Sequence, residues 1–346
     1  MEIRPEDGQT FLLALSAIVS CPNSTRYALT TFERDGWVTR VWTYQELVNN
    51  NKVRFIAEGG SDAWADVEDL LRSVIYAMID FKKSHGFDSV KMAALYPRLD
   101  SFDDFFVDWK VEGYLERSAY QVMSCMDRRD ATRPEDFFYA MVGAITVSPA
   151  ESQAPPPVHP AEHFMQICEA KGDSSFIYTT ASRSEVPGRR WRPKAADRFQ
   201  AVLPWHSHGE GQSGCVYPTH IQLNRMSRVS PGAITSTAKE HVGQWLRSTN
   251  TGSSAGNVQV RILRFLRRAG FSGCGEYLEM ESGYFFPHSS LNQSGSIFVA
   301  VATGLRMTLG APGLLLRQSG SGIDDCCGVG MFVGPVGESG GEINVG

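Results

Sequence analysis

The chain has 346 residues, a formal net charge of −5 and a pI near 5.9. Hydrophobic residues make up 42% and charged residues 21%, which supplies a sizeable core and excludes a disordered polyelectrolyte. Mild acidity without a basic stripe argues against a nucleic-acid binder, because the basic clusters at 189–192 and 264–268 are short. This length predicts two domains or one large one.

The cysteines and the N-terminal segment indicate the compartment. Seven cysteines are spread widely without a CxxC pair, so a reducing compartment fits better than a disulfide framework. The apolar stretch 11–21 follows acidic residues, which favours a buried helix over 9–20 rather than a signal peptide. No run reaches membrane length. We therefore expect a soluble, cytoplasmic protein with no membrane partner.

The first half of the chain is predicted to be helix-rich. Residues 37–50 favour a helix, or a tight turn followed by a helix, and residues 52–57 favour a strand. Ser61 or Asp62 is expected to cap a long helix that Gly86 ends. Its apolar face recurs at spacings of three and four: Trp64, Val67, Leu70, Leu71, Val74, Ile75 and Met78. Core packing accounts for this face without a ligand.

A second helical region and a spacer follow. Residues 101–128 are predicted to be helical. In the next helix Thr132 is expected to act as the N-cap, with Pro134 in the first turn and acidic residues behind it. Consecutive prolines make 148–160 a predicted extended linker.

The remainder is predicted to be a β-rich α+β region without internal repeats. We expect helices at 161–171 and near 238–250, and a helix or strand near 258–268. Glycine-bounded apolar runs predict strands at 295–303, 313–317 and 329–334. The tail 337–346 is expected to be frayed.

The segment 37–46, WVTRVWTYQE, is the most informative motif. On a helix Trp42 and Glu46 are four residues apart and share a face, and Arg40 can pair with a nearby carboxylate. A buried tryptophan that anchors a helix, with Glu46 in a local salt bridge, accounts for these residues on chemistry alone.

This segment resembles the end of the conserved region of fungal heterokaryon-incompatibility (HET) domains, whose run W-x-x-R-x-W-T-x-Q-E precedes a strand. The matching residues are Trp37, Arg40, Trp42, Thr43, Gln45 and Glu46. The family carries a later block R-x-x-x-x-x-P-x-D-x-x-Y-A-L-x-G. The matching residues are Arg128, Pro134, Asp136, Tyr139, Ala140, Met141 (in place of Leu) and Gly143. Two blocks in the right order identify the chain as similar to this family.

The resemblance implies an α/β fold that is incomplete here. HET domains are similar to TIR domains, which have a flavodoxin-like fold, and their earlier blocks are not found in the 36 residues before Trp37. We therefore expect an N-terminally truncated member: 1–60 as the later part of the domain, 61–147 as its helical extension, 148–160 as the linker and 161–346 as a C-terminal region of unknown role. An incomplete sheet leaves an exposed edge and predicts poor solubility.

The resemblance also suggests an activity. Some TIR domains cleave NAD with a glutamate four residues after a tryptophan, a spacing that Trp42 and Glu46 share. A carboxylate there holds ribose hydroxyls and stabilises positive charge as the glycosidic bond breaks. A single glutamate without its pocket is not an enzyme. Glu46 is therefore expected to be catalytic, and NAD to be its substrate, only if an intact pocket surrounds this residue.

Metal ligands are not expected. His206, His208 and Glu210 alternate, but they lie in a glycine-rich loop without a third well-placed ligand, and Asp324 to Cys327 is a poor zinc site. No resident cofactor is predicted. Three functions remain: self/non-self recognition and cell-death signalling through protein partners or self-association, NAD hydrolysis of TIR type, or an inactive scaffold.

Overall fold

The structure is a computed structural model of the whole chain. It describes residues 25–49, 54–56, 64–87, 89–100, 117–146, 158–204, 211–248, 257–291, 295–307, 309–337 and 340–346; for 54–56, 64–65 and 89–90 this covers the backbone only. The chain forms two compact units, the first from residues 1–116 and 128–152 and the second from 117–127 and 153–346. The predicted helix at 9–20 and the histidine pair at 206–208 lie outside the described residues.

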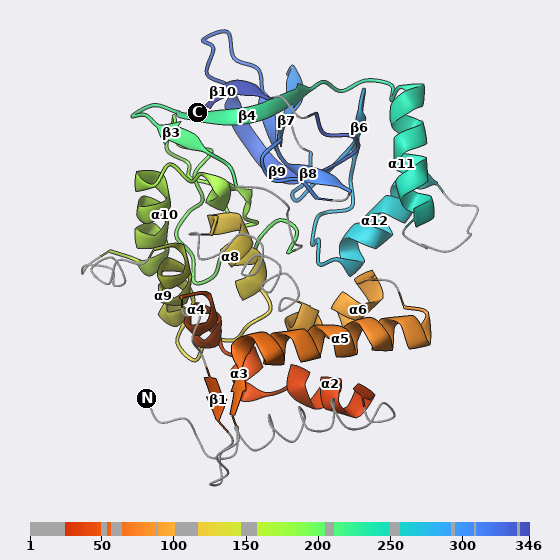
Figure 1. Cartoon of the computed structure of the whole chain (residues 1–346). Helices are drawn as coiled ribbons and strands as arrows, with labels where there is room; N and C mark the ends of the chain where they lie inside the picture. Colours follow the sequence, from red (N-terminus) through yellow and green to blue (C-terminus); the bar gives the residue numbers. More distant parts are fainter. Residues whose placement is uncertain are drawn as a thin grey trace. The chain divides into compact units, whose positions relative to one another are not determined.

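The first unit is mainly helical (Figure 1). Its described elements are α2 Thr25–Glu33, α3 Gly36–Thr39, α4 Val41–Asn49, β1 Arg54–Ile56, β2 Trp64–Asp66, α5 Val67–His85, α6 Ser89–Leu95 and α9 Pro134–Ile145. The predicted turn-plus-helix at 37–50 and the strand near 52–57 are confirmed as α3, α4 and β1.

The long helix α5 begins later than expected. Trp64 belongs to β2, which pairs antiparallel with β1, so the helix begins at Val67 with Asp66 as its N-cap. The predicted stop is confirmed, because Gly86 adopts the left-handed conformation with φ 62° and its N–H bonds the Lys82 and Lys83 carbonyls. The predicted N-cap of α9 is wrong: Arg133, not Thr132, occupies that position, without a side-chain cap bond.

The second unit combines helices with an eight-stranded antiparallel sheet, which confirms the predicted mixture of helix and strand. Its helices are α8 Ala119–Met126, α10 Pro160–Ala170, η4 Ser175–Tyr178, α11 Ser236–Ser248 and α12 Val258–Arg268. Its strands are β3 Gly214–Val216, β4 Ile221–Val229, β5 Leu278–Met280, β6 Gly283–Pro287, β7 Ile297–Ala302, β8 Gly310–Arg317, β9 Asp325–Val333 and β10 Gly341–Val345. The segment 258–268 is thus a helix, and α10 begins at Pro160, inside the stretch expected to be linker.

The segment 117–127 joins the second unit through specific bonds. Ser118 and Gln121 form a capping box at the start of α8. The Asp173 carboxylate accepts hydrogen bonds from the N–H of Ala119 at 2.6 Å and of Ser175 at 2.8 Å. Tyr120 donates its hydroxyl to the Leu203 carbonyl at 2.7 Å. These bonds tie α8 to residues that follow α10 in the chain.

The sheet closes into a ring. Its strand order is β10-β4-β7-β8-β9-β6-β5, with β3 also pairing with β4. Beyond β4, Pro231 bridges to Met280 of β5, and the N–H of Gly232 bonds the Glu279 carbonyl at 3.1 Å. The strands β4, β7, β8, β9, β6 and β5 therefore surround a common interior.

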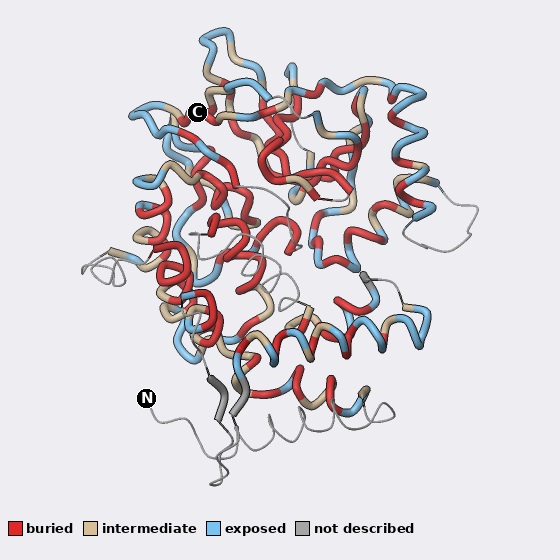
Figure 2. The backbone as a smooth tube through the Cα atoms, in the orientation of Figure 1, coloured by how far each residue is buried: buried red, intermediate tan, exposed pale blue. Residues whose placement is uncertain are grey.

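Apolar side chains fill this interior. They come from alternate positions of the ring strands, as the two-residue strand period requires. The cluster consists of Val229, Met280, Phe285, Val299, Val301, Ala311, Leu315 and Phe332. The strands β7, β8 and β9 are buried along most of their length (Figure 2).

The end of the tail, residues 340–346, is ordered, contrary to the expected fraying. Residues Gly341–Val345 form β10, which pairs antiparallel with β4. Val345 also forms a parallel bridge with Asp324, and the N–H of Gly346 bonds the Asp324 carbonyl at 2.8 Å. Within the described residues, none of the helices has the length and apolarity needed to cross a bilayer.

Candidate functional site

The two motif segments of the first unit lie against each other. The backbone of Arg40, between α3 and α4, forms a parallel bridge with Asp130. The Val41 N–H bonds the Asp130 carbonyl at 3.2 Å, and the Asp130 N–H bonds the Thr39 carbonyl at 2.7 Å. This pairing joins the segment 37–46 to the segment 128–143.

Arg129, which sequence reasoning missed, anchors this junction. Its side chain is 2% exposed, and its Nη1 donates to the carbonyl oxygens of Val38 at 3.0 Å and Arg40 at 3.2 Å, and to the Thr43 hydroxyl at 3.0 Å. Its guanidinium also lies 5.6 Å from the centre of the Tyr44 ring. Nothing in the sequence distinguishes Arg129 from its neighbour.

The helices α4 and α9 meet at a glycine. A Cβ atom at position 143 would overlap the side-chain amide of Gln45, so an added methyl group would require the end of the Gln45 side chain to move. The Asn49 side chain donates to the Gly143 carbonyl at 2.5 Å. Two motif residues, Gln45 and Gly143, therefore define the helix contact.

The aromatic and acidic motif residues are more accessible. Trp37 and Trp42 are half-buried, and the Trp37 N–H bonds the Asp35 carboxylate at 2.8 Å. Glu46 is exposed on α4. Partial desolvation of its carboxylate raises the pKa of Glu46, while the positive charge of Arg40 opposes this shift. No Arg40–Glu46 ion pair within 4.0 Å occurs among the described salt bridges.

A second set of charges surrounds Arg128. Its Nη1 donates to the Pro97 carbonyl at 2.8 Å and to the Asp100 carboxylate at 3.1 Å. Burial raises the pKa of Asp100, and the positive charge of Arg128 offsets only part of this rise. Arg98 donates to the Arg128 carbonyl at 2.9 Å and pairs with Asp130 at 3.1 Å. Arg128 therefore holds neighbouring backbone in place, as a structural residue does.

Glu33 is a buried acid whose carboxylate lies beside Arg98 and Leu99. Its carboxylate accepts hydrogen bonds from the backbone N–H of Arg98 at 3.0 Å and of Leu99 at 2.9 Å, and it lies 3.7 Å from the Arg98 guanidinium. Desolvation raises the pKa of Glu33, although the two N–H bonds and the arginine charges lower it.

The remaining motif residues belong to α9. Pro134 begins the helix, as predicted, and Asp136 lies in its first turn, 3.3 Å from the Arg133 guanidinium. Tyr139 is half-buried, whereas Ala140 and Met141 are fully buried. These residues start the helix and fill the core.

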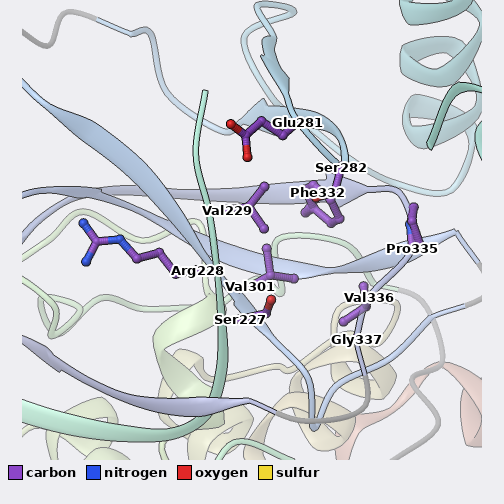
Figure 3. A pocket seen from close by; sticks show the side chains of 10 residues that line it. All are labelled: Ser227, Arg228, Val229, Glu281, Ser282, Val301, Phe332, Pro335, Val336 and Gly337. Carbon is purple, nitrogen blue, oxygen red and sulfur yellow. The ribbon is translucent and has the colours of Figure 1, made fainter. Parts of the chain in front are cut away.

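The second unit contains a cavity at one end of the ring, which sequence reasoning did not predict. It has a volume of about 320 Å³, near the lower limit for small-molecule pockets. Figure 3 shows the lining residues: Ser227, Arg228, Val229, Glu281, Ser282, Val301, Phe332, Pro335, Val336 and Gly337. They come from β4, β7 and β9, from the turn between β5 and β6, and from the segment after β9, so only folding brings them together.

In the described part of the chain, no group of three or more His, Cys, Asp or Glu side chains is placed to hold a metal ion. Asp325 instead pairs with Arg317 at 2.8 Å, and the Asp324 carboxylate accepts the Ser319 N–H at 3.1 Å. Both acids therefore have structural partners.

No model of a known protein family, no curated protein and no solved structure matches the chain. The candidate sites are therefore defined by their own residues. One is the α3–α4 segment joined to 128–143 in the first unit, and the other is the cavity of the second unit.

Proposed function

We propose that this chain is a heterokaryon-incompatibility protein that acts in fungal self/non-self recognition and programmed cell-death signalling in the cytoplasm. The pairing of the two motif segments supports this proposal: Arg40 bridges to Asp130, and Gln45 packs on Gly143. Segments almost ninety residues apart carry the resemblance and share one interface, which is the arrangement expected if they belong to one family domain.

In this proposal the first unit contains the later part of a flavodoxin-like HET domain with its helical extension. Several motif residues organise the fold, since the Arg40 backbone, the Gln45 side chain and Gly143 hold segments together. The accessible residues Trp37, Trp42 and Glu46 then form the surface available to a protein partner or a second copy. The C-terminal unit senses the trigger or regulates the cell-death response.

NAD cleavage is the second candidate, and one observation favours it. Glu46 is exposed, four residues from Trp42 on α4, and its carboxylate has a raised pKa. Groups that act on substrates often have perturbed pKa values. An inactive scaffold built on the same fold is the third candidate.

Induced expression in a filamentous fungus separates these candidates. Signalling through binding predicts that wild type arrests growth, and that Glu46→Gln weakens the arrest only in part because it removes one charge from an exposed binding surface. NAD cleavage predicts that purified wild-type protein releases nicotinamide and that Glu46→Gln loses both effects. The matched control is Glu240→Gln, an exposed glutamate on α11. Absence of both growth arrest and nicotinamide release with wild type leaves only the scaffold.

A further inference from the structure

The cavity of the second unit has an apolar wall within a lining that is about half polar. Val229, Val301 and Phe332 form its walls and belong to the interior cluster of the ring, and Val336 packs against that cluster. The hydroxyl-bearing residues Ser227 and Ser282 add polar lining. An occupant can therefore place an apolar part against this wall and a polar part against the remaining lining, and a volume of about 320 Å³ limits it to a small molecule or a single long side chain.

Two charged residues, Arg228 and Glu281, line the cavity, and the Arg228 side chain is turned away from its apolar wall. The guanidinium of Arg228 lies over the Phe298 ring, 3.6 Å from its centre, and its side chain points away from the other lining residues in Figure 3. A cation held on an aromatic face is stabilised there. The Arg228 guanidinium therefore has a partner outside the cavity.

Glu281 is the other charged residue. Its backbone is fixed by the closure of the ring, because its N–H bonds the Ser230 carbonyl at 3.2 Å and its carbonyl accepts the Thr235 N–H at 3.0 Å. Glu281 is exposed and its carboxylate makes no ion pair within the described residues, so an unpaired negative charge stands at the edge of the cavity beside its apolar wall. An anionic ligand is repelled, and a cationic group is attracted.

We propose that this cavity binds an apolar stem that ends in a cation, either a primary ammonium or a guanidinium group. The stem lies against Val229, Val301 and Phe332, and the cation pairs with the Glu281 carboxylate. A free alkylamine and the lysine or arginine side chain of a peptide share this chemistry. The inference depends on the second unit alone and is independent of the function proposed for the first.

Methyl NMR of the full chain with labelled valines tests the proposal, with hexylamine as the probe. Hexylamine should shift the methyl signals of Val229, Val301 and Val336, and leave that of Val260, which is 53% exposed on α12, in place. Hexanol should bind more weakly, and hexanoate weakest. Equal shifts with hexylamine and hexanoate, or no shift of the three cavity valines, overturn the proposal.

Glu281→Gln adds a second measurement. It should weaken hexylamine binding about threefold and leave hexanol binding unchanged, as expected for one solvent-exposed ion pair. Glu240→Gln on α11 is the matched control and should change neither. If Glu281→Gln fails to fold, the three-ligand series on wild type still decides the matter. N-acetyl-lysine amide distinguishes the sources: tighter binding than hexylamine favours a peptide side chain, and weaker binding favours a free amine.

Discussion

The side chain of Gln45 lies directly against Gly143, where α4 meets α9. A Cβ atom at position 143 would overlap the Gln45 amide, and Asn49 bonds the Gly143 carbonyl one helical turn further along α4. The last residue of the second motif block thus contacts a residue of the first block.

A double-mutant cycle at this contact should show strong coupling. Gly143→Ala should reduce the free energy of unfolding by about 1–3 kcal/mol, because the new methyl group overpacks the contact. In a Gln45→Ala background the same change should be neutral or stabilising by up to about 1 kcal/mol, because alanine favours helix. Urea unfolding of the four proteins measures this coupling. Equal costs in both backgrounds would show that Gln45 does not exclude the methyl group.

Arg129→Met should destabilise the first unit strongly. The substitution leaves the acceptors at Val38, Arg40 and Thr43 without their buried donor. We expect a loss of about 2–4 kcal/mol in the free energy of unfolding. Arg133→Met, at an exposed arginine of the same region, is the control and should leave the unfolding midpoint unchanged. Similar midpoints for the two variants would refute the anchoring role of Arg129.

The buried acid Glu33 should make stability depend on pH. Its pKa is raised above the ordinary 4.5, so the folded state binds this proton more tightly than the unfolded state. The resulting stabilisation is fully present below pH 4.5 and is lost as the pH rises through the raised pKa. Glu33→Gln removes this titration.

Wild type should therefore lose stability relative to Glu33→Gln as the pH rises. Thermal unfolding of both proteins at a series of pH values from 4.5 upward measures the difference. The control pair, wild type and Glu240→Gln, should show no such trend. A difference that stays constant, or that moves in favour of wild type with rising pH, would assign the slope to other groups.

Asp173→Ala should weaken the attachment of α8 to the rest of the second unit. The carboxylate bonds the N–H of Ala119 and of Ser175, and loss of such a cap costs about 1–2 kcal/mol. Tyr120→Phe removes the bond to the Leu203 carbonyl and should cost about 1 kcal/mol. Hydrogen exchange should be faster in residues 119–126 of both variants. Unchanged exchange there would show that packing alone holds α8.

Local signals in the sequence predicted much of the first unit. The spacing of Leu70, Leu71 and Val74 predicts α5, and Gly86 predicts its end, because both depend on residues within a few turns. The start of α5 was misplaced because the apolar spacing continues back to Trp64, whose backbone pairs with Ile56 instead. At Trp64, pairing between β1 and β2 overrides the helical pattern that the spacing of apolar residues suggests.

Long-range contacts account for what the sequence did not predict. β10 is a short run between glycines, and its order depends on β4, more than a hundred residues earlier in the chain. The ring closes through Pro231 and Met280, so the cavity and the position of Glu281 follow from closure. The anchoring role of Arg129 likewise depends on carbonyls about ninety residues away.

Growth of a filamentous fungus after induced expression is the most direct test of the proposed cell-death function. Wild type should arrest growth, whereas Gly143→Leu, which forces a large side chain into the Gln45 contact, should lose the effect at equal protein level. The double variant Gln45→Ala/Gly143→Ala should arrest growth as wild type does, because it restores the fit of α4 on α9. Hyphae that express folded wild-type protein and grow as fast as those expressing Gly143→Leu would contradict the proposal.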